Sequence, residues 1–342
     1  MDLESLGNAF EDAGEGIRTL LSSSTLADGA YKHPLVRPHF QATPGGAMTV
    51  FSRAAAYIVA ASLTGLLSGR AGLPTGRFDV LVGSVKSVET TTTETDREIT
   101  LLTRHFMIFS PSPGPYRVES FVPVIEIQGQ RRDFDFGPRL EPRGAALDVL
   151  VSYAEALAAF ARKDYQGELD QATQSLGGSV QRLASIPTAT AEVKQGAGVL
   201  ATGVNALGRA IIDRMRKAAL GKAMNEAAPG IQQIVTFVKD INSLAAVAVG
   251  VMRDDMLRKA NGITPADGLA RVQLNERVEA VVVESNTILA RLKQINTAID
   301  AIKPAHDEIR EALVRDEGAP LEKLKALVAE AKRLQRFYST LK

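Results

Sequence analysis

The sequence predicts a mainly α-helical fold, an elongated antiparallel helical bundle that carries a small antiparallel β-rich subdomain (α+β). Three observations predict this fold: an apolar heptad pattern over residues 274–313, helical periodicity from residue 141 to the end, and strand-like sequence between residues 76 and 140. The composition agrees, because aromatic residues make up only 5% of the chain and Trp is absent. A core built mainly of Ala, Leu, Val and Ile suits packed helices.

The N-terminal part of the chain divides into two segments by composition. Residues 1–46 carry a pattern typical of a short helix, followed by an irregular stretch with three prolines. Residues 47–75 predict an apolar helix, in which 47–67 holds a single charge, Arg53, and reaches the lower range of a membrane span. Two interpretations stay open for 47–67, a helix buried in the core and a membrane-inserting segment. The side chains that would insert are Val50, Phe51, Tyr57, Ile58, Val59, Leu63, Leu66 and Leu67.

Residues 76–140 predict the β-rich subdomain. Branched and aromatic residues dominate Phe78–Val82, Ile99–Phe109 and Phe121–Ile127, and Gly, Pro and Thr bound these runs. The run Thr90–Thr93 predicts the polar end of a hairpin. We expect an antiparallel sheet of about three to five strands.

Residues 141–342 predict the long helical bundle. The heptad pattern over 274–313 gives a helix of about 60 Å at 1.5 Å per residue, which Pro304 should kink near Ala301. Its apolar seam consists of Leu274, Val278, Val281, Ile288, Leu292, Ile295, Ile299, Ile302, Ile309 and Leu313. At heptad spacing, this seam is typical of a coiled coil and closes either within one chain or between chains.

Two further features of the bundle region predict how its helices pack. Four glycines between residues 196 and 208 indicate that another backbone approaches closely, and Pro229-Gly230 predicts a turn. Leu244–Met252 is apolar nearly all round, as expected of a central helix.

No residue pattern predicts a catalytic, cofactor-binding or metal site. The chain has no cysteine and four histidines, and no two histidines have the helical spacing of a metal-binding pair. The best carboxylate pair, Asp133 and Asp135, would share one face of a strand, either for acid–base chemistry or as a solvent-exposed polar face. His306 falls in the seam, where we expect a buried, hydrogen-bonded histidine, with a titrating switch as the alternative.

The charge pattern bears on partners and compartment. The chain has 40 basic and 39 acidic residues, a net charge of +1, which does not provide the field expected of a nucleic-acid-binding protein. Met1–Glu15 is acidic, unlike the start of a signal peptide. The compartment stays undecided: cytoplasmic for the sequence as written, bacterial envelope or secreted if a leader peptide is removed.

These observations predict a non-enzymatic interaction or scaffold protein, of bacterial origin by its use of Ala, Arg and Gly. It would bind a protein partner, or itself, through the flanks of the bundle and the β subdomain. A second hypothesis is a membrane-active protein that resembles helical pore-forming toxins in layout without sharing a motif, with 47–67 inserting and Leu244–Met252 assisting. A third is an enzyme or ligand carrier with a pocket between the β subdomain and the bundle.

Overall fold

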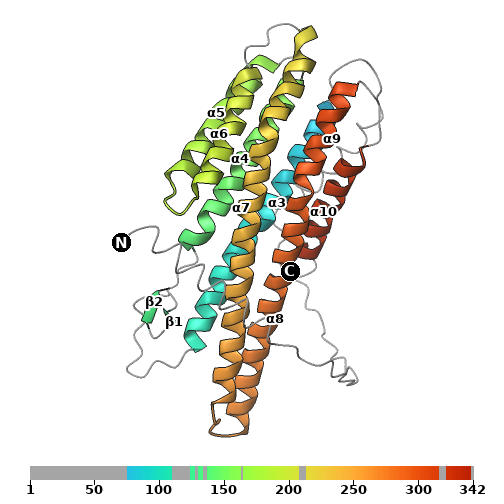
Figure 1. The fold of residues 1–342 in the computed structure, drawn as a ribbon. Helices are drawn as coiled ribbons and strands as arrows, with labels where there is room; N and C mark the ends of the chain where they lie inside the picture. The colour runs from blue at the N-terminus through green and yellow to red at the C-terminus, as the bar shows by residue number, and fades with distance from the viewer. Residues whose placement is uncertain are drawn as a thin grey trace, which may run out of the picture. The chain divides into compact units, whose positions relative to one another are not determined.

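A computed structural model of the chain describes residues 75–109, 124–127, 130–133, 137–162, 165–207, 213–315 and 321–339. All of them fall in the second of the two units into which the chain divides, residues 50–342. The segments predicted at 1–46 and 47–67 lie outside the described residues. The elements are α3 (Thr75–Phe109), β1 (Val124–Ile127), β2 (Gln130–Asp133), α4 (Gly137–Ala161), α5 (Tyr165–Ser185), α6 (Ala191–Leu207), α7 (Asp213–Asn261), α8 (Gly268–Asp300), α9 (Ile302–Arg315) and α10 (Glu322–Ser339) (Figure 1).

The mainly helical prediction is confirmed, but the predicted β-rich subdomain at 76–140 is wrong. Helix α3 takes up two of the three segments that were expected as strands, together with the supposed hairpin end at Thr90–Thr93. Strands β1 and β2 form a two-stranded antiparallel hairpin in which Val124 pairs with Asp133 and Ile127 with Gln130. Among the described residues no third strand joins this hairpin.

Helix α3 forms because its buried residues recur at helical rather than strand spacing. The Oγ1 atom of Thr92 donates to the carbonyl oxygen of Val88 at 2.8 Å, and that of Thr95 to the carbonyl oxygen of Thr91 at 2.8 Å. A hydroxyl satisfied by its own helix can be buried without help from a neighbouring helix. The buried face steps by three and four residues in turn, through Phe78, Leu81, Val85, Val88, Thr92, Thr95, Ile99 and Leu102.

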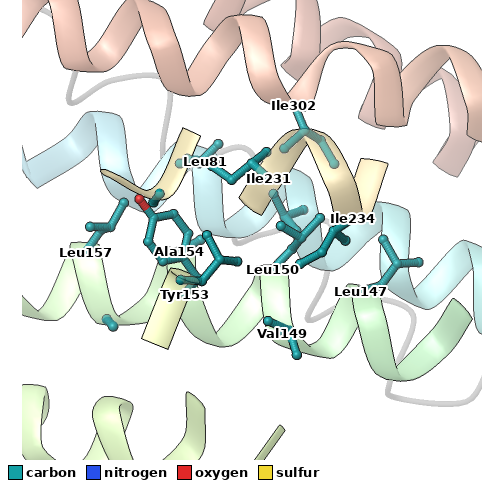
Figure 2. Packing of buried hydrophobic residues seen from close by; sticks show 14 of the residues in the cluster. Leu81, Leu147, Val149, Leu150, Tyr153, Ala154, Leu157, Ile231, Ile234 and Ile302 are labelled. Carbon is teal, nitrogen blue, oxygen red and sulfur yellow. The ribbon is translucent and has the colours of Figure 1, made fainter. Parts of the chain in front are cut away.

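Helix α4 lies at the centre of the packing. It contacts α3 and α7 as well as α5 and α6, and most of its residues are buried. Figure 2 shows the part of this core where α4 meets α3, α7 and α9. The side chains that meet there include Leu81, Leu147, Leu150, Tyr153, Leu157, Ile231, Ile234 and Ile302.

Helices α6 and α7 bring their backbones close together at two of the four glycines singled out in the sequence, Gly196 and Gly203. Gly198 has nothing within 4 Å of its Cβ position, and Gly208 lies outside the described residues. A Cβ atom on Gly230 would lie 2.5 Å from the carbonyl oxygen of Gly196, and one on Gly203 would lie 3.1 Å from that of Ala223. The turn predicted at Pro229-Gly230 is wrong, because both residues lie inside α7. Gly230 instead lets α7 approach α6 at the level of Gly196.

The helix predicted over 274–313 is divided into α8 and α9 at Ala301, where the sequence places a kink. Helix α8 begins after Asp267, whose Oδ1 accepts a hydrogen bond from the N–H of Ala270 at 2.8 Å and so caps the first turn. Two seam residues, Leu274 and Val278, are half-buried. The other eight are buried: Val281, Ile288, Leu292, Ile295, Ile299, Ile302, Ile309 and Leu313.

Candidate interaction surface

Most of the buried apolar side chains in the described residues belong to one of two clusters. The larger cluster joins α3, α4, α5, α6, α7, α9 and α10 and takes in α8 only from Ile295 onward. The smaller cluster lies where α3 packs against the hairpin of α7 and α8, and Leu140 near the start of α4 joins it. Its members are Ile99, Leu102, Leu140, Ala245, Val249, Met252, Met256, Val281, Ile288 and Leu292.

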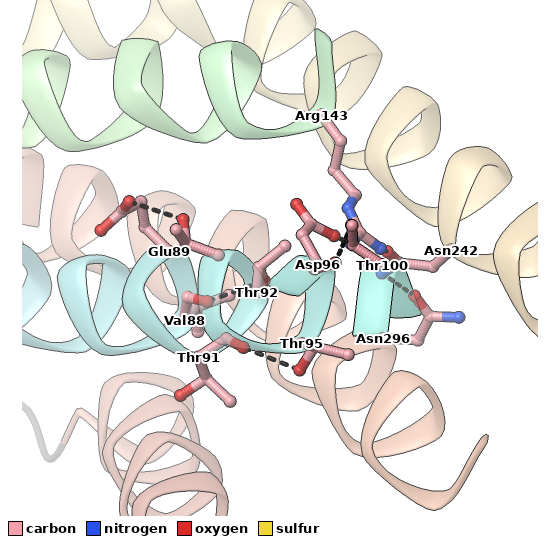
Figure 3. Close-up of polar contacts among 11 residues, drawn as sticks. Val88, Glu89, Thr91, Thr92, Thr95, Asp96, Thr100, Arg143, Asn242 and Asn296 are labelled. Carbon is pink, nitrogen blue, oxygen red and sulfur yellow. Dashed lines mark hydrogen bonds and ion pairs between the residues drawn. The ribbon is translucent and has the colours of Figure 1, made fainter. Parts of the chain in front are cut away.

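A group of polar side chains, hereafter the polar layer, lies at the boundary between these clusters: Asp96 of α3, Arg143 of α4, Asn242 of α7 and Asn296 of α8 (Figure 3). The Arg143 guanidinium forms an ion pair with the Asp96 carboxylate and donates a hydrogen bond to Oδ1 of Asn242. Asn242 in turn donates from Nδ2 to Oδ1 of Asn296 at 2.6 Å. One connected network therefore links four helices.

The charge of Arg143 is buried completely, with 0% of the residue exposed. Burial lowers the pKa of Arg143 from 12.5 to about 9, so that the guanidinium stays charged at neutral pH beside Asp96. A second ion pair joins Glu98 of α3 to the buried Arg291 of α8 next to the layer. Because desolvation of both charges opposes their attraction, a buried ion pair of this kind adds little net stability to a fold.

Beyond the polar layer, residues 97–105 of α3 and 243–292 of α7 and α8 form a three-helix end, hereafter the tip (Figure 1). In the part of the chain that the structure describes, every exposed large apolar side chain belongs to the tip. These are Leu101, Leu244, Val247, Val251, Ile263, Leu269, Val272 and Val283. Exposed apolar side chains gathered in one region mark an interaction surface more strongly than the same number scattered singly.

The exposed side chains of α7 follow one face of the helix. Leu244, Val247 and Val251 are spaced i, i+3 and i+7, while Ala245, Val249 and Met252 face the smaller cluster. The expectation that Leu244–Met252 is buried as a central helix is therefore wrong. Its apolar sequence is divided between a buried face and an exposed face.

The tip carries nearly balanced charge. Its two stretches, residues 97–105 and 243–292, together contain eight basic and seven acidic side chains. Such a surface offers no positive field to attract nucleic acid or an anionic membrane. Two described helices, α4 and α7, are long and apolar enough to cross a membrane by length and composition alone; the apolar window is 78% buried in α4 and 39% buried in α7.

His306 is buried, as expected, and hydrogen-bonded across the core. Its Nε2 lies 3.0 Å from the hydroxyl oxygen of Tyr153, and its Nδ1 lies 3.5 Å from Oδ1 of Asp307. Burial lowers the pKa of His306, more than the neighbouring Asp307 raises it. The pKa of Asp307 is lowered, first by its contact with His306 and then by the hydrogen bond that its carboxylate accepts from Lys303 at 2.6 Å.

The remaining sequence candidates do not come together in a site. The eight side chains predicted to insert into a membrane lie outside the described residues. Asp133 is the last residue of β2, and its predicted partner Asp135 lies outside the described residues. No group of three or more metal-binding side chains occurs among the residues that the structure describes. The third hypothesis places a pocket between a β subdomain and the bundle, but the described part of residues 76–140 holds helix α3 and a two-stranded hairpin instead of that subdomain.

Comparison with family models, curated proteins and solved structures finds no match for this chain.

Proposed function

We propose that this chain is a non-enzymatic interaction protein that binds a protein partner through the tip. The observation that carries the proposal is the position of the exposed apolar side chains, all of which, among the described residues, lie beyond the polar layer. The flanks of the bundle between the layer and its other end expose no large apolar side chain in the described ranges. The tip, rather than the flanks or a β insertion, is the surface that we assign to the partner.

The chemistry of the tip favours an amphipathic helix as the partner element. Leu244, Val247 and Val251 have the spacing of anchors that face an apolar helix or groove. The balanced charge of the tip gives no preference for an anionic partner. The partner surface would therefore be apolar and nearly neutral.

A triple variant tests this proposal. Replacing Leu244, Val247 and Val251 with Asp removes the exposed stripe but leaves the buried face of α7 intact. Binding to a purified partner should weaken by about tenfold or more, because truncating even one central anchor of an interface commonly costs over 1 kcal/mol. The partner is first identified by photo-crosslinking from position 247, and its affinity is then measured by titration calorimetry.

The matched control replaces three exposed glutamines of α5, Gln171, Gln174 and Gln181, with Asp. This variant adds the same charge far along the sequence from the tip, and should bind as the wild-type chain does. Equal affinities for the wild-type chain and the tip variant, with both folded by circular dichroism, would overturn the proposal. An equal loss in both variants would assign the effect to charge rather than to the stripe.

A membrane-active function is the second candidate, and one observation favours it. The apolar window of α7 is only 39% buried, whereas that of α4 is 78% buried. Against it, α8 is paired with α7 and carries exposed charges at Arg271, Glu276 and Arg277, which are costly in a bilayer. Dye release from liposomes at neutral and acidic pH separates the two functions. If no dye is released at either pH, the membrane-active function is ruled out. The bacterial origin predicted from the sequence stays a prediction under both functions.

A further inference from the structure

The change from one cluster to the other coincides with a polar residue on each of four helices. On α3, Asp96 lies between Val88 of the larger cluster and Ile99 of the smaller. On α4, Arg143 lies between Leu140 and Ala145.

The same order holds on the other two helices. On α7, Asn242 separates Val238 from Ala245, and on α8 the change occurs between Leu292 and Ile295, next to Asn296. Ile241, which is partly buried, contacts both clusters. The polar layer therefore crosses the bundle at one level, with little apolar contact through it.

Such a layer weakens the energetic connection between the two sides. Apolar burial makes the unfolding of a core cooperative, because each side chain that moves out of the core exposes its apolar neighbours to water. Across the layer, the side chains of neighbouring helices are joined instead by an ion pair and by hydrogen bonds of amide side chains. The net contribution of these interactions to the free energy of folding is small, because the polar groups lose their hydration when they are buried. On α3 the layer is widened by Thr91, Thr92 and Thr95, whose hydroxyls bond within their own helix.

The two sides also differ greatly in size. The smaller cluster contains 10 buried residues, and the larger contains 48. A three-helix unit with so few buried side chains has a low stability of its own. The exposed apolar residues of the tip reduce the apolar area that the unit buries on folding still further.

We propose that the tip opens as a cooperative unit of its own while the larger cluster stays folded, with the polar layer as the boundary. Opening separates the tip residues of α3, α7 and α8 and exposes the inner face of α7, including Val249 and Met252. A partner helix that enters an open tip would then meet two apolar faces of α7 instead of one. This last consequence rests on the proposed function, whereas the opening itself does not.

Hydrogen exchange along α7 tests the opening without any partner. This helix continues without a break from Asp213 to Asn261, so that its amides before Val238 and after Ala245 differ mainly in which cluster they adjoin. Exchange in low, sub-denaturing urea should give protection factors at least about tenfold lower in residues 245–258 than in 220–238. The tip amides of α7 and of α8 should share one value and respond equally to urea.

Two outcomes would overturn the proposal. One is equal protection on both sides of Asn242. The other is a gradual loss of protection toward Asn261 that does not depend on urea, because that is the behaviour of a fraying helix end.

A pair of double variants tests whether the polar layer is the boundary. Asp96→Leu with Arg143→Leu replaces the buried ion pair by apolar side chains and should bring the protection factors of the two halves of α7 closer by about tenfold. The control is Asp79→Leu with Arg162→Leu. It removes an exposed ion pair between α3 and the residue that follows α4, in which a guanidinium nitrogen of Arg162 lies 3.1 Å from Oδ1 of Asp79, together with the exposed pair of Arg162 and Glu168. This variant should leave the difference unchanged. A difference that persists in the first variant, or that vanishes equally in both, would show that the boundary lies elsewhere. The exchange experiments use no partner. If the tip variant bound its partner as the wild-type chain does, the proposed function would be wrong, but the proposed opening of the tip would still stand or fall on the exchange data alone.

Discussion

Tyr153 and His306 are 153 residues apart in the chain, yet the hydroxyl oxygen of Tyr153 lies 3.0 Å from Nε2 of His306 in the core between α4 and α9. The two rings are tilted, with their centroids 5.8 Å apart. Both side chains are buried, and burial raises the pKa of Tyr153 and lowers that of His306. Both side chains therefore stay uncharged at neutral pH, and the hydrogen bond between them replaces the hydrogen bonds to water that they lose on burial.

This pair predicts a loss of stability at mildly acidic pH. Because the pKa of His306 is lower in the folded chain than its ordinary value of 6.5, the unfolded chain binds a proton that the folded chain does not. The free energy of unfolding should therefore fall as the pH drops below 6.5, with a slope of up to about 1.4 kcal/mol per pH unit from this residue. Urea denaturation at several pH values between about 5 and 7.5 measures the slope.

The control for this prediction is His306→Gln, which keeps a polar side chain near Tyr153 but cannot titrate. The difference in unfolding free energy between the wild-type chain and this variant isolates His306. Asp307 does not interfere, because its lowered pKa affects stability only below its ordinary value of 3.8. Identical pH slopes in the two proteins would contradict the prediction.

The seam of α8 and α9 could be predicted from the sequence because branched aliphatic residues occupy it almost without interruption. In α3 the same three-four spacing is hard to recognise in the sequence, because Thr92 and Thr95 occupy two of its buried positions. A run of threonines and branched residues also has high strand propensity. Tertiary packing of the buried face, together with hydroxyl bonds to the helix's own carbonyls, outweighed that propensity.

The tip and the polar layer could not be predicted in the same way. Asp96, Arg143, Asn242 and Asn296 come from four separate helices, and nothing in their local sequence distinguishes them from solvent-exposed polar residues. The exposed stripe of α7 is likewise hidden inside a segment that is apolar on all sides. Which of its faces is covered depends on where α3 and α8 lie, which is a property of the assembled bundle.

The glycine contact between α6 and α7 predicts opposite effects for two similar substitutions. Gly230→Ala should lower the free energy of unfolding by about 1–3 kcal/mol, because its Cβ would lie 2.5 Å from the carbonyl oxygen of Gly196 and the helices must separate. Gly198→Ala should raise it by up to about 1 kcal/mol, because nothing lies within 4 Å of its Cβ and Ala favours the helix. Thermal and urea unfolding of both variants measure whether each substitution raises or lowers the free energy of unfolding. A gain of stability in both variants would mean that helix propensity, not backbone approach, decides at Gly230.

The threonines of α3 predict tolerance to an isosteric apolar residue. In Thr92→Val and Thr95→Val the side-chain volume is kept, and the carbonyl oxygens that lose the hydroxyl bond retain their ordinary helical partners. Each variant should be within about 0.5 kcal/mol of the wild-type chain or more stable, because a buried polar group is replaced together with its need for a partner. Thr92→Ala is the comparison, since it leaves a cavity and should be clearly less stable in the same urea titration. A valine variant as unstable as the alanine variant would show that the hydroxyl itself is needed.

The ion pair of the polar layer predicts that removing one partner is worse than removing both. Among the described residues, Asp96→Ala leaves the fully buried Arg143 with the amide oxygen of Asn242 as its remaining partner. The change should cost about 3 kcal/mol of unfolding free energy, the lower end for a broken buried pair, because Asp96 is itself partly exposed. Replacing Asp96 and Arg143 together with Leu removes the charge that needs a partner and should cost less than the single change. Urea titrations of the two variants at neutral pH decide the order. A double variant that is less stable than Asp96→Ala would mean that the pair stabilises the bundle on balance, and the layer would then hold the tip to the bundle instead of separating them.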